Sequence, residues 1–179
     1  MLSERIQEAL NAQLNAEAYS GYLYLAMAAH FEPLGIDGLA RWMASQAREE
    51  FYHASKFYRF INERGGRVTL KGIEGPPAQW SSPLAVFEAV LAHEQKVTGL
   101  INALVDLARD EGDHATEIFL QWFVTEQVEE ENSAGEIVQK LKLLGDSGHG
   151  LLMFDKELGQ RAISPAVAAA LTGASPPAV

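Results

Sequence analysis

The sequence predicts an all-α protein: a four-helix bundle with one long crossover and a short fifth helix near the C-terminus. Two observations support this fold class. Apolar residues recur at helical spacing along four long segments, each of roughly 28 to 32 residues. Two connections between these segments are short, so they join antiparallel neighbours, whereas residues 65–81 form a connection long enough to run the length of a helix.

The first two helices are bounded by recognisable start and stop signals. The first is expected to begin after Ser3, a good N-cap, and to stop at Pro33, because the residue before a proline is disfavoured in the helical region. The second opens near Asp37 and ends at Gly65 and Gly66. The turn between them is short, which predicts an antiparallel pair.

The third and fourth helices form the second expected pair. The third begins at Ser82 and Pro83, since proline is well suited to the first helical position, and it ends at Gly112. The fourth begins near Asp113 and ends at Gly145. These signals again leave only a short turn between neighbours.

The remaining segments complete the expected organisation. Val68 and Leu70 suggest extended chain in the crossover, and residues 151–160 form a short amphipathic fifth helix. Residues 1–160 are therefore expected to form one bundle domain. Residues 161–179 are rich in alanine and proline and are predicted to form a C-terminal tail.

The composition narrows the possible functions. Fourteen Lys and Arg against 24 Asp and Glu give a net charge of −10, which disfavours nucleic acid and anionic membrane surfaces as partners. There is no cysteine, so disulfides, thiolate zinc sites and iron–sulfur clusters are excluded. The chain start shows no secretory signal, and no apolar stretch is long enough to span a membrane. We therefore expect a cytoplasmic protein.

Acidic residues interrupt all four apolar stripes near the middle of each helix. The stripe carboxylates are Glu17, Glu50, Glu94 and Glu130, and two further polar residues lie three positions away on the same faces, His53 and Gln127. Helices of similar length bring mid-helix residues to one level, where unpaired buried carboxylates are very costly. Four carboxylates balance two divalent cations, and oxygen-rich ligation with one imidazole suits iron or manganese.

Several stretches carry a resemblance to a known family. They are LNAEAYS at 14–20 with Tyr24, QAREEFYH at 46–53, ERGGRV at 63–68, His93-Glu94, and QWFVTEQVEEE at 121–131. Together these motifs resemble the non-haem bacterial and archaeal ferritins, over the chain from its start to about Gln160. The ferritin-like four-helix bundle is the fold that this resemblance implies.

The resemblance also implies a di-iron ferroxidase centre. It assigns Glu17, Glu50 and His53 to the first iron, Glu50 as a bridge with Glu94 and Glu130 to the second iron, Gln127 to a nearby position, and Glu49, Glu126 and Glu129 to a third iron. Tyr24 matches the tyrosine beside the centre that supplies an electron during oxygen reduction. We treat Glu131 as a surface residue, and His30, His93, His114 and His149 as surface or boundary residues.

Departures from related families exclude other cofactors. Phe51 stands where bacterioferritins place a haem-ligating methionine, and Gln127-x-x-Glu130 replaces their second Glu-x-x-His motif, so we expect no haem. The absence of cysteine excludes the cysteine-ligated iron of rubrerythrins. Some family members line a three-fold pore with two acids, but here Glu117 is accompanied by Leu120, which disfavours an acidic pore.

The function implied by the resemblance is iron storage and detoxification. Fe(II) is oxidised by dioxygen or peroxide, and ferric mineral is deposited in a homo-oligomeric cage, usually of twenty-four subunits. Three alternatives remain open: a non-storing di-iron oxidase or peroxidase, a structural bundle with protonated or hydrated acids, and a DNA-coating mini-ferritin. The acidic charge disfavours the last of these.

Overall fold

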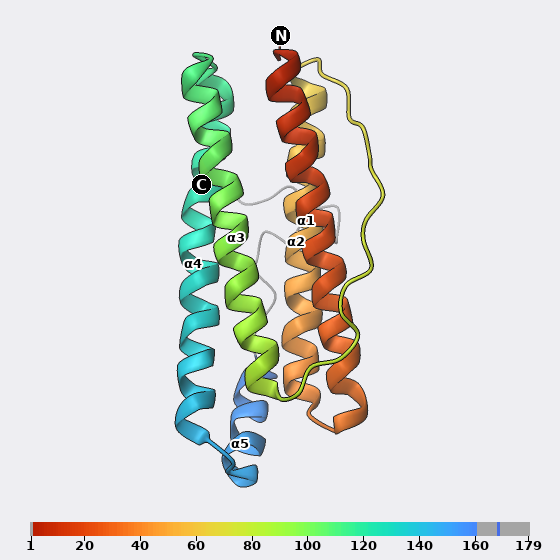
Figure 1. Ribbon diagram of the computed structural model, residues 1–179, viewed down its shortest axis with the longest axis vertical. Coiled ribbons are helices and arrows are strands. Elements are labelled where there is room, and N and C mark those ends of the chain that lie inside the picture. The colour runs from red at the N-terminus through yellow and green to blue at the C-terminus, as the bar shows by residue number, and fades with distance from the viewer. Residues whose placement is uncertain (1, 161–167, 169–179) are drawn as a thin grey trace. The chain divides into compact units, whose positions relative to one another are not determined.

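The described part of the chain contains five α-helices, and Figure 1 shows them in a computed structural model. The structure describes residues 2–160 and 168, so the predicted tail lies outside the described residues except at position 168. The helices are α1 (Glu4–Phe31), α2 (Asp37–Glu63), α3 (Pro83–Asp110), α4 (His114–Leu144) and α5 (Gly148–Leu158), with a 3-10 turn η1 (Glu32–Leu34) after α1. Within that part of the chain there is no β-strand, and no helix has the length and hydrophobicity that a bilayer crossing requires.

Local capping explains why the helices begin and end where the sequence predicts. The hydroxyl of Ser82 accepts a hydrogen bond from the Ala85 amide at 3.1 Å, and the Asp113 carboxylate accepts one from the Thr116 amide at 3.1 Å. Both bonds satisfy amides that lack a partner in the first turn of a helix. Gly112 adopts φ +65°, a left-handed conformation that ends α3 and favours glycine.

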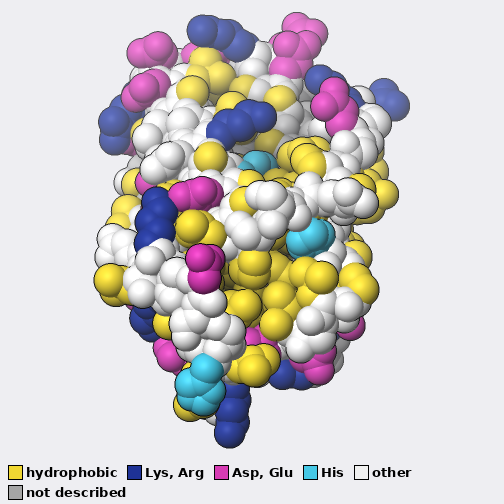
Figure 2. Space-filling model, turned by 60° about the horizontal axis from the view of Figure 1, so that its bottom comes forward, with side chains coloured by type: hydrophobic (Ala, Val, Ile, Leu, Met, Phe, Trp, Pro, Cys, Tyr) yellow, Lys and Arg dark blue, Asp and Glu magenta, His cyan; other side chains and the backbone are white. Residues whose placement is uncertain are grey.

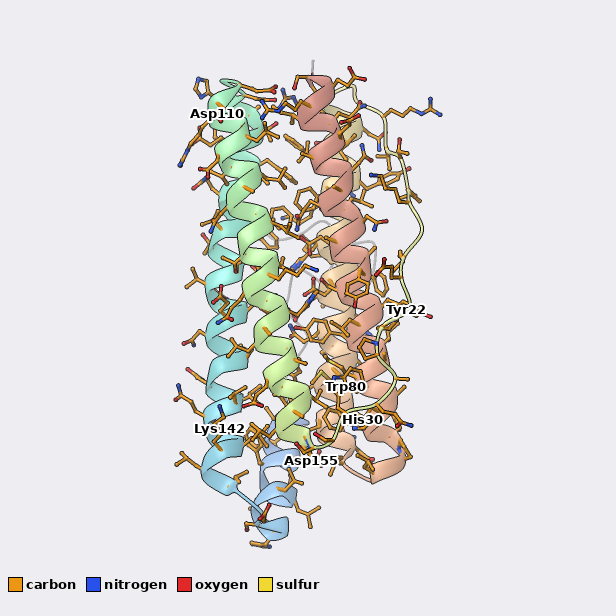
Figure 3. All side chains as sticks on the ribbon, viewed as in Figure 1. Tyr22, His30, Trp80, Asp110, Lys142 and Asp155 are labelled. Carbon is orange, nitrogen blue, oxygen red and sulfur yellow. The ribbon has the colours of Figure 1, made fainter. Side chains whose placement is uncertain are left out.

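The chain forms two compact units, and the first contains α3 and α4 with α1 up to Gln13 and residues 61–69 and 80–82. In Figure 1, α3 and α4 run antiparallel beside each other. Lys142, labelled in Figure 3, reaches from α4 to Glu88 of α3 with an Nζ–Oε1 distance of 2.9 Å. Apart from two adjacent pairs, the buried residues of α3 recur every three or four positions: Val86, Phe87, Val90, Glu94, Val97, Ile101, Leu104, Val105 and Ala108. This spacing places them on one face of the helix, which is apolar except at Glu94.

Side chains of α1 hold the start of the crossover. Residues 66–80 have no helix or strand, so their backbone polar groups need other partners. The side chain of Asn11 donates to the Arg67 carbonyl at 3.0 Å and accepts from the Thr69 amide at 2.7 Å. The Arg67 amide donates to Gln7 Oε1 at 2.7 Å. Two residues one helical turn apart on α1 thus stabilise the extended segment in place of a neighbouring strand.

The second unit contains α1 from Leu14 onward, α2 as far as Phe60, residues 70–79 and α5. The two long helices run antiparallel beside each other, joined through η1 and Gly35 (Figure 1). Gly35 takes φ +70° and follows the 3-10 turn that Pro33 helps to form. The predicted antiparallel pairing of these two helices is therefore present.

The fifth helix begins three residues before the predicted start at position 151 and ends at Leu158 rather than at 160. Its N-cap is Ser147, whose hydroxyl accepts from the Gly150 amide at 3.1 Å. The glycines at 148 and 150 are typical of loops, so the propensity of these residues argued against a helix. The cap and the packing of the helix outweigh that preference.

Arg64 and Asp113 connect the end of α2 to the N-terminus of α4. The guanidinium donates to both carboxylate oxygens, at 3.0 and 3.1 Å. Burial raises the pKa of the Asp113 carboxyl, but hydrogen bonds from Arg64 and Thr116 outweigh it and the net pKa is lowered. The ionised carboxylate therefore stabilises the folded state.

We expect Asp113→Ala to lower the free energy of unfolding by about 1 to 3 kcal/mol at neutral pH, because the helix cap and the ion pair are both lost. The folded pKa lies below the unfolded one, so this contribution is present above about pH 4 and is lost as the pH falls through the folded pKa. Denaturant unfolding of both proteins across this range measures the effect. Asp113→Asn keeps the cap and should lose less. Equal stability of Asp113→Ala and the natural chain at pH 7 would contradict the prediction.

Candidate metal centre

Three of the predicted metal ligands meet inside the second unit. Glu17 lies on α1, and Glu50 and His53 lie on α2, where a spacing of three residues places them on one face. Their exposed fractions are 1%, 2% and 3%. His53 Nδ1 is 3.9 Å from Glu17 Oε2 and 3.6 Å from Glu50 Oε2, and one donor atom from each residue lies within 4.8 Å of the others. We call these three residues the Glu17–Glu50–His53 triad.

The chemistry of the triad fits a cation. Two carboxylates in a water-excluded site repel each other unless a positive charge or a proton intervenes. Donors that coordinate one ion at about 2.1 Å lie roughly 3 to 4 Å from each other. The separations from His53 fall in this range and exceed those of hydrogen bonds. Carboxylate oxygens with one imidazole nitrogen suit iron or manganese.

In the first unit, three more predicted ligands are buried on α3 and α4. Glu94, Gln127 and Glu130 have exposed fractions of 1%, 5% and 6%. Gln127 Nε2 donates to the Glu94 backbone carbonyl at 3.2 Å and to its Oε2 at 3.3 Å, so the structure brings these two side chains together. Glu130 lies one turn after Gln127 on the same face of α4.

The three residues assigned to a third iron differ from one another in burial. Glu49 is buried on α2 with an exposed fraction of 7%. On α4, Glu126 is half-buried and Glu129 is exposed. Glu129 therefore has the environment of a solvated surface residue.

Tyr24 is a core residue of the second unit. It is 1% exposed and lies two helical turns after Glu17 on α1. Its ring packs edge-on against Trp42, with centroids 6.3 Å apart and an interplanar angle of 66°. This edge-on contact favours one orientation of the Tyr24 ring within the apolar core.

His93 precedes Glu94 and is half-buried, as expected for a boundary residue. Burial, with a smaller effect of Lys96, lowers its pKa to about 4. The imidazole is therefore neutral at pH 7 and adds no positive charge to balance the neighbouring carboxylate.

Sequence reasoning missed two residues beside the Glu94–Gln127 pair. Glu131, expected at the surface, is half-buried and accepts a hydrogen bond from the Thr98 hydroxyl at 2.6 Å. Gln127 Nε2 also donates to Thr98 Oγ1 at 3.3 Å. The available signal was spacing, since Thr98 and Glu131 each lie four residues after a predicted ligand, on the same helix face.

Comparison with known proteins gives concordant matches. The family described as "Ferritin-like domain" matches residues 7–144. Curated bacterial non-heme ferritins from Bacteroides fragilis and Staphylococcus aureus are 47% and 39% identical over 161 residues, which is 90% of this chain and 100% and 97% of those proteins. An open pore ferritin from Archaeoglobus fulgidus superposes with a TM-score of 0.90 at 53% identity, covering 90% of this chain and all of that one.

Proposed function

Because the chain belongs to the ferritin-like family, we propose that it stores iron and oxidises Fe(II) at a ferroxidase centre. The observation that carries this proposal is the buried Glu17–Glu50–His53 triad. Both its donor types and its charge suit Fe(II), which is the substrate here. The names of the relatives, bacterial non-heme ferritins, support iron as the metal and disfavour haem.

The proposed centre holds two ferrous ions in each chain. The triad binds the first ion. Glu50 is shared with the second ion. Glu94 and Glu130 supply the other carboxylates to that ion, and Gln127 lies near it. Four carboxylates neutralise two divalent ions, so the burial of these acids is compensated when iron binds.

The protein's contribution to the reaction is to hold two ions at a short separation for oxidation by dioxygen or peroxide. In this proposal Tyr24 supplies a further electron to the reduction of oxygen, and its burial protects the ring from water. Glu49, Glu126 and Glu129 provide a third iron site. Ferric product then moves on to be mineralised.

We further propose that the chain assembles into a homo-oligomeric cage of twenty-four subunits. Measurement of the particle size tests this assembly most directly. Several large hydrophobic side chains of the α1–α2 pair stay exposed in the single chain: Tyr22 at 48%, Leu25 at 43%, Phe51 at 44% and Tyr58 at 51%. Figure 2 shows hydrophobic side chains reaching the visible surface among charged ones. Apolar surface of this kind is typical of interfaces between proteins.

Addition of Fe(II) to metal-free protein without oxygen, followed by admission of oxygen, tests the proposal. We expect far more than two ferric ions per chain to stay soluble in a large particle. Uptake that stops at two ions in a small particle would contradict storage and leave a di-iron oxidase. Absence of Fe(II) binding would contradict the ferroxidase centre and favour a structural bundle.

A further inference from the structure

We propose that Thr98 and Glu131 are positioning residues that set the orientation of the Gln127 carboxamide and, through it, of the Glu94 carboxylate. The inference rests on the proposed function, because it concerns how Glu94 is presented to iron. All four residues belong to the first unit, on α3 and α4.

The four side chains form one connected chain of hydrogen bonds. Gln127 Nε2 is 3.3 Å from Glu94 Oε2 and 3.3 Å from Thr98 Oγ1, while the Thr98 hydroxyl donates to Glu131 Oε1 at 2.6 Å. The bond to Glu131 is the shortest of the three. The bonds from Gln127 are long, because its two amide hydrogens serve three acceptors, the third being the Glu94 carbonyl at 3.2 Å.

The direction of these bonds reinforces the orientation in which the NH2 end of the Gln127 amide faces Glu94, whose carbonyl and carboxylate both accept from it. A threonine hydroxyl has one proton, and an ionised carboxylate can only accept. Since Thr98 donates its proton to Glu131, it has only lone pairs to offer to Gln127. It therefore binds the NH2 end of the amide, the same end that Glu94 requires, and the amide oxygen is turned away from both.

Loss of the preferred orientation of the Gln127 amide would weaken its hydrogen bonds to Glu94. A Thr98 hydroxyl without Glu131 can donate instead of accept, and it then stabilises the flipped amide. In that orientation the Gln127 oxygen faces the Glu94 carboxylate, and two acceptors repel each other in a site where Glu94 is 1% exposed. Glu94 then loses its defined position. Hydrogen-bond partners of metal ligands typically change affinity or activity by about 10 to 100-fold.

The test compares Thr98→Val with Thr98→Ser. Valine keeps the β-branched shape of threonine but removes the hydroxyl, and serine restores it. Calorimetric titration with Zn²⁺, which is redox-inert, reports each binding step, and the initial rate of Fe(II) oxidation gives KM and kcat. For Thr98→Val we expect the weaker of two Zn²⁺ affinities to fall about 10-fold, with the first unchanged and the KM for Fe(II) raised. Thr98→Ser should return both to within about twofold of the natural chain.

Two further variants separate positioning from simple helix packing. Glu131→Ala should weaken the same Zn²⁺ step at least as much as Thr98→Val, because it leaves the Thr98 hydroxyl able to donate to a flipped amide. The double variant should be no worse than Glu131→Ala, because both positions act through Gln127. Lys142→Met breaks another α3–α4 contact, the ion pair with Glu88, and should leave both Zn²⁺ affinities unchanged.

Unchanged Zn²⁺ affinities in Thr98→Val would overturn the inference, as would an equal loss at both steps or a failure of serine to rescue. If the natural chain neither binds a second Zn²⁺ nor oxidises Fe(II), the proposed function fails instead. That outcome is distinguished from failure of the inference because it appears without any substitution.

Discussion

Replacement of Glu50 by glutamine should slow the fast phase of Fe(II) oxidation on the order of 100-fold or more, because the substitution removes the carboxylate proposed to serve both ions. Glutamine keeps the size of the side chain, so the buried site can stay packed. Stopped-flow absorbance after mixing Fe(II)-loaded protein with oxygenated buffer measures the loss. Glu63→Gln, at the exposed end of the same helix, is the matched control and should oxidise iron at the natural rate.

The same substitution should raise the stability of the metal-free protein. Glu17 and Glu50 are both buried beside His53, and the loss of one charge relieves their repulsion. We expect a gain of about 1 kcal/mol or more in the free energy of unfolding of the metal-free form. With iron bound, the unsubstituted chain should be the more stable of the two, since it binds iron more tightly than Glu50→Gln. Rapid oxidation by Glu50→Gln would refute the assignment of Glu50, and a loss of metal-free stability would show that the carboxylate is compensated without metal.

The second large effect is expected at Gly38, in the first turn of α2. A Cβ atom there would lie 1.8 Å from the Asp155 carbonyl oxygen of α5, far inside van der Waals contact. The Asp155 side chain, labelled in Figure 3, also accepts a hydrogen bond from the Leu39 amide at 2.8 Å. The carboxylate thereby caps an amide that α2 cannot satisfy itself. Gly38 thus permits the close approach that this cap requires.

Gly38→Ala should therefore detach α5 from α2. We expect a local destabilisation on the order of 3 kcal/mol, from the steric clash, the lost cap and exposure of Phe154, which is now 5% exposed. Hydrogen–deuterium exchange should show faster exchange over residues 148–158. Gly99→Ala is the control: apart from the backbone of its own helix, no described atom lies within 4 Å of its Cβ position. Alanine at this exposed helix position should add about 0.5 to 1 kcal/mol of stability. If α5 of Gly38→Ala exchanges hydrogen at the same rates as in the unsubstituted chain, the close contact is disproved.

The helices themselves were determined by local sequence. Caps such as Ser82 and Asp113 and stops such as Gly112 act on neighbouring backbone, so the bounds of α3 and α4 could be predicted from a few residues. The predicted ferritin-like fold class is confirmed by the family match and by the similarity to solved ferritins. The start of α5 was misplaced because docking against α2 outweighs the low helix propensity of its two glycines.

In the candidate metal centre, too, some features follow from local sequence and others from packing between helices. Helical periodicity alone places Glu50 and His53 on one face, since both belong to α2. Periodicity identifies the inward face of a helix but leaves free its axial position against a neighbour. The similar helix lengths and the family resemblance predicted that Glu17 would join these two residues, and the packing of α1 against α2 places the three donor atoms within 4.8 Å of one another. The hydrogen bond from Thr98 to Glu131 likewise depends on the axial position of α3 against α4. Local sequence determined which face of each helix is buried, and packing between helices decided which buried polar residues lie close enough to share a hydrogen bond or to form a cluster of possible metal ligands.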